Sequence, residues 1–336
     1  MRFLCEPQVC SGDGGGQLIR IRHPRNTLGV HKGNAINLLE PRLCQRFDPL
    51  DPRLTADLEA QLGLNFPLRR LDLAGGQQAL RECGRGPAIV LLHGIGSGAA
   101  SWLAVAQLLG QRARVIAWDA PGYGQSSPLR SLAPDASDYA GRLGQMLDAL
   151  GVERCVLVGH SLGAITATAF ASGAQQQRVS RLVLISPAQG YGHPSRQAQG
   201  RAVRKKRLAD LEHPGIQAMA RQRSACMLSP GASPGDHAWV RWNMAQLNPE
   251  GYRQAIELLC GEDLLRQPPL SMPCDVHCGA ADGITTPDSC QLLARALGAS
   301  FSLMTGAGHA SPIEQPYAVA GRLALAIEHS LTGASL

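Results

Sequence analysis

Short apolar runs alternate with longer amphipathic segments from about residue 68 to the end of the chain. A short apolar run bounded by turn residues is typical of a strand buried on both faces of a sheet, and a longer periodic segment is typical of a helix. The runs fall at residues 88–94, 114–119, 155–160, 181–186, 274–280 and 301–307. Helices are expected between and after them, at 101–109, 137–150, 162–174, 289–298 and 318–331. This alternation predicts an α/β fold with a mostly parallel sheet and helices on both faces.

Three segments depart from this rhythm. Residues 68–83 form two short polar-apolar strands around Gly75 and Gly76, which predicts a hairpin. Residues 187–270 are helical in pattern and richer in Met, Trp and Arg, so we expect a helical cap inserted between core segments 67–186 and 271–336. Residues 1–66 contain a GDGGG run and scattered prolines, and they predict a poorly ordered extension with one short helix near Leu54–Leu62.

The strongest chemical signal is the sequence Gly159-His160-Ser161-Leu162-Gly163, which lies between a predicted buried strand and a helix. A sharp strand-to-helix turn pushes a serine hydroxyl out above the sheet, and the glycines keep the strained backbone free of bulk. The bare G-x-S-x-G pattern also occurs by chance. Its position between strand and helix favours Ser161 as a nucleophile.

A general base and an orienting acid are expected at the same edge of the sheet. His309 follows the last predicted strand, and Asp282 follows the strand before it. The carboxyl ends of parallel strands share one edge, so His309 can reach the serine hydroxyl and Asp282 can hold its imidazole in the correct tautomer. Asp263 is the rival acid, although it lies within the predicted cap.

The segment His93-Gly94-Ile95-Gly96 follows the first buried strand. Acyl transfer requires backbone N–H groups that meet the developing oxyanion, and we assign these to Ile95 and Leu162. The same segment also fits a G-x-G-x-x-A dinucleotide fingerprint from Gly94 to Ala99, with Asp119 placed as a ribose-binding acid. A dinucleotide enzyme has no need of the serine turn or the late Asp-His pair, so this interpretation is disfavoured, and Asp119 and Tyr123 are expected to form a structural turn.

Taken together, the segments HGIGSGAASW, DAPGYGQS, GHSLGA, GAADGIT and GAGHASPIEQP resemble the α/β-hydrolase family over about residues 68–330. The resemblance implies an eight-stranded core sheet, a helical cap, no metal or organic cofactor, and a triad of Ser161, Asp282 and His309. The likeness is greatest to hydrolases of small esters, enol-lactones and carbon–carbon bonds. Carbon–carbon hydrolases usually have Trp after the catalytic His, where this chain has Ala310. Haloalkane dehalogenases use an Asp nucleophile, which Ser161 argues against.

Composition adds limits. The chain has 336 residues, of which 44% are hydrophobic and 17% charged, with a net charge of +6. This balance is globular and too weakly basic to indicate nucleic-acid binding. No apolar run is long enough to span a membrane and no secretion signal is evident, so we expect a cytoplasmic protein whose ten cysteines are reduced. The Cys274-Asp-Val-His277-Cys278 run lacks a second ligand pair for a metal and is expected to be a buried strand.

The predicted cap carries two further candidates. Its large apolar residues are candidates for an acyl pocket, although each of them is more simply explained by packing within the cap: Met219, Met227, Trp239, Trp242 and Met244. The basic run Arg196 to Arg207 either binds an acidic substrate or carrier or forms a solvated helix face, which we favour.

The sequence therefore predicts a serine hydrolase that cleaves a small-molecule carboxylic ester or lactone through an acyl-enzyme. Two alternatives stay open. One is a carbon–carbon bond or enol-lactone hydrolase of aromatic breakdown. The other is a member of the fold that binds a ligand without turnover.

Overall fold

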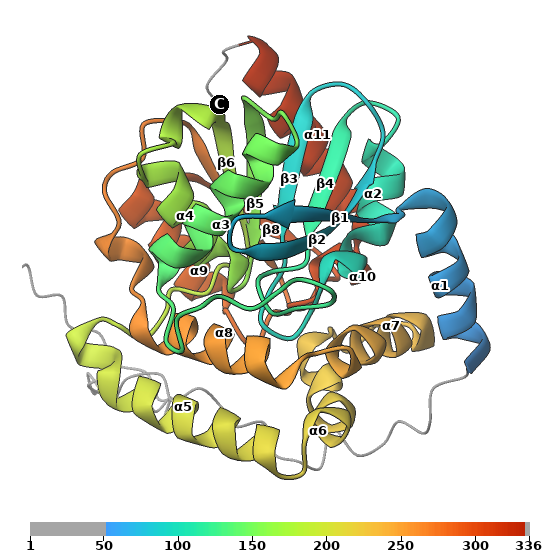
Figure 1. Ribbon diagram of the computed structural model, residues 1–336, viewed down its shortest axis with the longest axis vertical. Helices are drawn as coiled ribbons and strands as arrows, with labels where there is room; N and C mark the ends of the chain where they lie inside the picture. Colours follow the sequence, from blue (N-terminus) through green and yellow to red (C-terminus); the bar gives the residue numbers. More distant parts are fainter. Residues whose placement is uncertain (1–51, 333–336) are drawn as a thin grey trace, which may run out of the picture. The chain divides into compact units, whose positions relative to one another are not determined.

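The computed structural model describes residues 52–332, so most of the predicted N-terminal extension lies outside the described residues. Eight strands form one sheet in the order β1-β2-β4-β3-β5-β6-β7-β8 (Figure 1). Their bounds are β1 Leu68–Leu73, β2 Gly76–Cys83, β3 Ala88–Leu92, β4 Arg114–Trp118, β5 Cys155–His160, β6 Val179–Ile185, β7 Cys274–Gly279 and β8 Ser300–Met304. β2 pairs antiparallel with both β1 and β4, and the other neighbours are parallel. The predicted α/β-hydrolase fold is confirmed.

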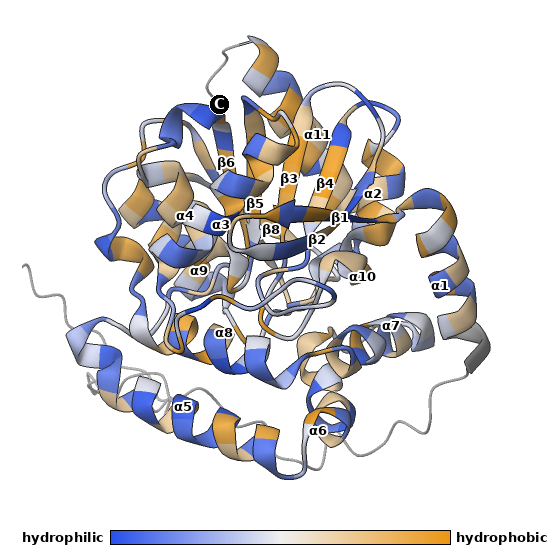
Figure 2. Cartoon of the chain, viewed as in Figure 1, coloured by the Kyte–Doolittle hydropathy of each residue, from blue (hydrophilic) through white to orange (hydrophobic). Residues whose placement is uncertain are grey.

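Successive residues of the central strands pack into two different cores. In β3, Ile89 and Leu91 join one cluster of buried residues, while Val90 and Leu92 join another. Side chains of a strand alternate between its faces, so a strand that is apolar at every position must be covered on both sides. The helices on the first side are α2 Leu103–Leu109 and α11 Pro316–Thr332; those on the second are α3 Ala136–Ala149, α4 Gly163–Ser172 and α9 Pro287–Leu297 (Figure 1). Figure 2 shows the apolar strands between these layers.

Between β6 and β7 the chain forms a helical insertion, here residues 187–273. Its helices are α5 Gln197–Glu212, α6 Ile216–Arg223, α7 Pro234–Ala245 and α8 Pro249–Gly261. α7 and α8 each begin with a capping side chain, Ser233 and Asn248, followed by proline in the first turn. The insertion reaches the loops that follow the strands, since the amide of Ala310 donates to the carbonyl of Met227 at 2.8 Å. Its role as a cap remains a prediction.

The structure corrects the expected start of the ordered chain. Helix α1 spans Pro52–Asn65, whereas the sequence predicted a poorly ordered segment up to residue 66 with only a short helix. Leu58, Leu62 and Phe66 follow one helical stripe and pack into the core cluster that contains α2 and α11, and Phe66 is fully buried. The carboxylate of Glu59 accepts a hydrogen bond from the indole of Trp242 in α7 at 2.6 Å. The i, i+4 spacing of these apolar residues is what attaches the segment to the core.

Within residues 52–332, no helix combines the length and the apolar character that crossing a membrane requires.

Candidate active site

Ser161 lies at the turn between β5 and α4, with a φ of 52°. This left-handed conformation is rare for a residue with a side chain and is held by the amide of Ser161, which donates to the carbonyl of Ile185 at 3.0 Å. The two glycines of the motif are required by close approach. A Cβ on Gly159 would lie 2.6 Å from the Cα of Ala164, and one on Gly163 would lie 2.5 Å from the carbonyl oxygen of Leu92. The turn therefore forces the serine hydroxyl away from the sheet.

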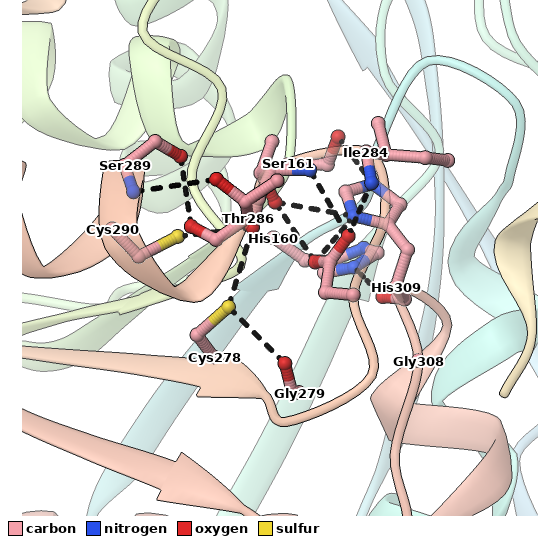
Figure 3. Close-up of polar contacts among 12 residues, drawn as sticks. His160, Ser161, Cys278, Gly279, Ile284, Thr286, Ser289, Cys290, Gly308 and His309 are labelled. Atoms are coloured by element: carbon pink, nitrogen blue, oxygen red, sulfur yellow. Dashed lines mark hydrogen bonds and ion pairs between the residues drawn. The ribbon is translucent and has the colours of Figure 1, made fainter. Parts of the chain in front are cut away.

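The structure brings Ser161, His309 and Asp282 together in one hydrogen-bonded chain, and Figure 3 shows Ser161 beside His309. The Nε2 atom of His309 lies 2.9 Å from Oγ of Ser161, and its Nδ1 atom lies 2.9 Å from Oδ2 of Asp282. All three residues are buried. In this geometry Nε2 can take the serine proton while the carboxylate holds Nδ1–H.

The carboxyl group of Asp282 is held as an anion. Its Oδ1 atom accepts the amides of Ile284 and Thr285 at 2.8 and 3.0 Å. Burial by itself raises the pKa of Asp282, but the charge of His309 and the hydrogen bonds to the carboxylate outweigh it and lower the pKa to about 2. Asp263, the rival acid, instead caps a short turn by accepting the amide of Leu265 at 3.2 Å.

Thr285 is a part of this site that sequence reasoning missed. Its hydroxyl donates to Oδ2 of Asp282 at 2.9 Å, and Oγ1 lies 3.3 Å from Nδ1 of His309. It thereby restricts the carboxylate to the orientation that meets the imidazole. The available signal was the short spacing from Asp282 to a hydroxyl residue in a turn, which is typical of local side-chain to backbone hydrogen bonding.

His160 was also missed, although it belongs to the serine motif. Its Nε2–H donates to the carbonyl oxygen of His309 at 2.8 Å, and the two imidazole rings lie 5.1 Å apart. Burial, together with the charge of His309, lowers the pKa of His160 to about 3, so this ring is neutral at physiological pH. It fixes the backbone of the candidate base and does not compete for its proton.

The loop after β3 lies directly against the nucleophile. A Cβ on Gly94 would lie 2.9 Å from the Cβ of Ser161. The carbonyl of Gly94 accepts Nδ1–H of His93 at 2.8 Å and the amide of Ser97 at 3.2 Å. The N–H of a trans peptide points opposite to its C=O, so these bonds also fix the direction of the Ile95 amide. Within the described residues, no hydrogen bond is made by the amides of Ile95 and Leu162, the two predicted oxyanion donors.

Two residues of the predicted structural turn anchor this loop from behind. The phenol of Tyr123, which is 3% exposed, donates to the carbonyl of Ile95 at 2.8 Å. The carboxylate of Asp119 accepts the amide of Ala99 at 2.8 Å. Asp119 therefore supports the loop from within, which explains its place after β4 without a nucleotide.

A clamp joins the His309 loop to the helical insertion. The carboxylate of Glu314 accepts the amide of Gly308 at 2.9 Å and the amide of Ser229 at 2.7 Å. Burial raises the pKa of Glu314, against the hydrogen bonds that lower it. One side chain thus positions the base loop against the segment that follows α6.

The five predicted pocket residues separate into different environments. Met227 lines a cavity of about 20 Å³, which it shares with Gly96, Asn243 and His160, the residue before Ser161. The methyl group of Met244 lies 3.1 Å from the position of a Cβ on Gly96, so it contacts the loop after β3. The remaining three pack within the protein. Met219 is 2% exposed, and Trp239 stacks on Trp242 at 4.6 Å where α7 meets α1.

A second, narrower cavity of about 10 Å³ lies beside the loop that follows β3. Gly94, Leu162, Tyr123 and Tyr139 line it on the core side, and Ala255 and Leu258 of α8 line it on the side of the insertion. The two cavities therefore flank the candidate nucleophile.

The described residues contain no cluster of three or more His, Cys, Asp or Glu arranged to hold a metal ion. The predicted buried strand is β7, in which Cys274 and Cys278 are buried and His277 hydrogen bonds to Ser302 at 2.9 Å. Burial raises the pKa of Cys274 to about 12, which keeps this thiol protonated.

Solved structures of several hydrolases share this fold. A malate-bound thermophilic esterase from Thermogutta terrifontis superposes with a TM-score of 0.69 and 24% identity, covering 78% of this chain and 98% of that one. An enol-lactonase from Burkholderia xenovorans gives a TM-score of 0.68 and 24% identity, covering 79% of this chain and all of that one.

Sequence relatives match over shorter stretches. An uncharacterised protein of Mycobacterium tuberculosis is 44% identical over 112 residues, which are 33% of this chain and 32% of that protein. A 2-hydroxy-6-oxononadienedioate/2-hydroxy-6-oxononatrienedioate hydrolase of Pseudomonas putida is 37% identical over 32% of this chain and 38% of its own. The match thus spans about a third of the length of these two relatives. RutD of Serratia proteamaculans, a candidate carbamate hydrolase, is 30% identical over 60% of this chain and 70% of its own.

The family model described as the alpha/beta hydrolase family matches residues 89–322, more than two thirds of the chain and all but the hairpin end of the sheet. With the strand order and the strained serine turn already established, this match assigns the chain to the alpha/beta hydrolase family.

Proposed function

We propose that this protein is a serine hydrolase that cleaves a carboxylic ester or lactone through an acyl-enzyme. The observation that carries the proposal is the hydrogen-bonded chain from Ser161 through His309 to Asp282, with 2.9 Å at each step. These distances are the ones that a serine nucleophile, its base and the group that orients the base require, and they support the proposal.

The first half of the proposed reaction forms the acyl-enzyme. Oγ of Ser161 bonds to the acyl carbon while its proton passes to Nε2 of His309, and Asp282 stabilises the imidazolium. The amides of Ile95 and Leu162 donate to the oxyanion of the tetrahedral intermediate. The bond to the alkoxide then breaks, and the departing oxygen takes the proton from His309.

The second half releases the acid. Water attacks the acyl carbon and gives one proton to His309, which returns it to Oγ of Ser161 as the acyl bond breaks. The carboxylic acid leaves, and the resting hydrogen bonds are restored. No step needs a group beyond the substrate, water and these residues.

A second candidate function is cleavage of a carbon–carbon bond, which is favoured by the name of the Pseudomonas putida relative. Ala310 follows His309 here, and its amide is used to bond the carbonyl of Met227. The small side chain leaves the space beside the base to Met227 and Ile313, which line the cavity there.

The proposal is tested first with a fluorophosphonate probe and Ser161→Ala as the control. Labelling of the wild type at Ser161, with none in the variant, is expected. A panel of 4-nitrophenyl esters of rising chain length then tests ester cleavage, and a 2-hydroxy-6-oxodienoate tests carbon–carbon cleavage. If Ser161 is not labelled and neither substrate class is turned over, the protein is a binding member of the fold and the proposal fails.

A further inference from the structure

The basic run Arg196 to Arg207 separates into two faces once it is folded into α5. Arg204, which is exposed, pairs with Glu257 of α8 at 2.7 Å, and the exposed Lys206 pairs with Asp210 at 3.2 Å. Figure 2 shows hydrophilic and apolar positions alternating along α5. These are the surface ion pairs of a solvated helix, as expected for most of the run.

Arg207 differs from these exposed residues, because it is half-buried and lies among the inward-facing residues of α5. Gly200, Val203, Arg207 and Leu211 follow one another at intervals of three or four, which places them on one side of the helix. Gly200 and Leu211 are buried, and Val203 packs against the core cluster of the insertion and α8. A charged residue therefore occupies the middle of an inward apolar stripe.

Arg207 has no anionic partner among residues 52–332. Its Nη1 donates to the hydroxyl of Tyr252 at 2.7 Å. The phenol of Tyr191 and the thiol of Cys260 also lie close enough to interact with it, and both are neutral at physiological pH. A phenol occupies one of the five guanidinium N–H groups and cancels none of its charge. Taking a guanidinium out of bulk water is costly unless an anion compensates it.

A second guanidinium adjoins the first. Arg223 of α6 donates to Asp210 at 3.3 Å, and Asp210 lies one turn beyond Arg207 on α5. Lys206 shares the same carboxylate, so two cations pair with Asp210 while Arg207, whose charge acts on Arg223, pairs with no anion among the described residues. The local charge is positive, and two planar guanidinium groups are the side chains best suited to bind carboxylate or phosphate oxygens in pairs.

The position of Arg207 relates it to the candidate active site. Its partner Tyr252 is on α8, and Ala255 and Leu258 continue along that helix to line the narrower cavity. The opposite wall of the cavity is formed by Gly94 and Leu162, which adjoin Ser161. In addition, the positive charge of Arg207 reaches Tyr123, where it lowers a phenol pKa that burial raises. Arg207 is therefore close enough for its charge to act on Tyr123, which lines the narrower cavity and bonds the loop against the nucleophile.

We propose that Arg207, assisted by Arg223, binds an anionic group, carboxylate or phosphate, at the far end of the acyl substrate of Ser161. The inference rests on the proposed acyl chemistry for what occupies the near end. It narrows the substrate class to acyl compounds with a negatively charged terminus.

Equilibrium binding tests this without requiring turnover. The monoamide of adipic acid and adipamide differ only in the charge at one end, so calorimetry with the two isolates that charge. We expect the wild type to bind the monoamide at least about tenfold more tightly than adipamide. Arg207→Gln should remove this difference in affinity and leave adipamide binding unchanged. Arg207→Lys should restore part of the difference. The matched variant at an exposed position, Arg204→Gln, should retain all of it. An arm with 5-phosphonopentanamide distinguishes the anions, because the tighter of the two ligands identifies the source.

The idea is overturned if the wild type binds neither anion more tightly than adipamide, or if Arg204→Gln and Arg207→Gln weaken the monoamide equally. Its failure is separable from failure of the proposed function. If Ser161 is labelled and neutral esters are cleaved, but the anionic ligands bind no more tightly than adipamide, the anion site alone is contradicted. If anion binding depends on Arg207 but Ser161 is not labelled and no ester is turned over, the proposed function alone is contradicted.

Discussion

Nε2 of His309 lies 2.9 Å from Oγ of Ser161, although 148 positions separate the two residues in the chain. The contact is made possible by the sheet. β5 precedes Ser161 and β8 precedes the His309 loop, and β6 and β7 lie between them in the sheet. The loop reaches back across these strands, and its approach is fixed by the bond from His160 to the His309 carbonyl and by the Glu314 clamp.

Replacing the nucleophile should abolish turnover. Ser161→Ala is expected to lower kcat by roughly 10^6-fold, because the base and the acid have no function without the hydroxyl they activate. Initial rates on the best ester of the panel measure this, and Ser195→Ala, on an exposed turn, serves as the control. Activity of the Ser161 variant within tenfold of the wild type would exclude the serine mechanism.

The orienting acid should be distinguishable from its rival. Asp282→Asn is expected to lower kcat by about 10^4-fold, since an amide facing Nδ1 favours the wrong imidazole tautomer. Asp263→Asn should leave kcat nearly unchanged, because Asp263 only caps a turn. Equal losses in the two variants, or a larger loss in Asp263→Asn, would show that the acid is misassigned.

The low pKa of Asp282 predicts an acid-dependent loss of stability. A carboxyl group whose pKa is about 2 in the folded state, against an ordinary value of 3.8, contributes stability that is present above pH 4 and is lost as pH falls towards 2. The loss should be about 2 kcal/mol in the free energy of unfolding. Urea unfolding of the wild type and of Asp282→Asn at several pH values measures it, and parallel curves for the two proteins across this range would contradict the assignment.

The hydroxyl of Tyr123 should affect the transition state more than substrate binding. Tyr123→Phe removes the hydrogen bond to the Ile95 carbonyl and leaves the buried ring in place, so the loop that carries the Ile95 amide loses one of its anchors. We expect kcat to fall about tenfold with little change in KM. Tyr317→Phe is the matched control, because Tyr317 is 79% exposed. A rise in KM at constant kcat would indicate a contact to substrate in place of loop positioning.

Helix α1 should be an integral part of the fold. A chain that starts at residue 67 lacks the buried Leu62 and Phe66, whereas one that starts at residue 52 keeps them. Losing two buried side chains costs about 3 kcal/mol or more, which for a chain of this size lowers Tm by at least about 5 °C. Thermal unfolding of the two truncated chains measures the difference, and equal Tm values would show that α1 adds no stability.

The sequence was sufficient to predict the strands and helices and the positions of the candidate residues along the chain. Strands that are apolar at every position, such as 155–158, predict a sheet covered on both faces, because a strand has no other way to bury both sets of side chains. Ser161, Asp282 and His309 were predicted as site residues because each follows a strand, and the carboxyl ends of parallel strands meet at one edge. Local pattern and topology are sufficient for this inference.

How these candidate residues are supported, and which residues of the insertion lie near them, follows only from the packed fold. Thr285, His160 and Glu314 act through hydrogen bonds to groups whose positions depend on the whole fold. Helical periodicity also fails to distinguish Met227, beside the candidate nucleophile, from Trp239, beneath α1, because both are apolar residues of one insertion. The same holds for Arg207 among its basic neighbours: a charge run has one appearance in the sequence, and only the packing of α5 against α8 turns one of its members inward.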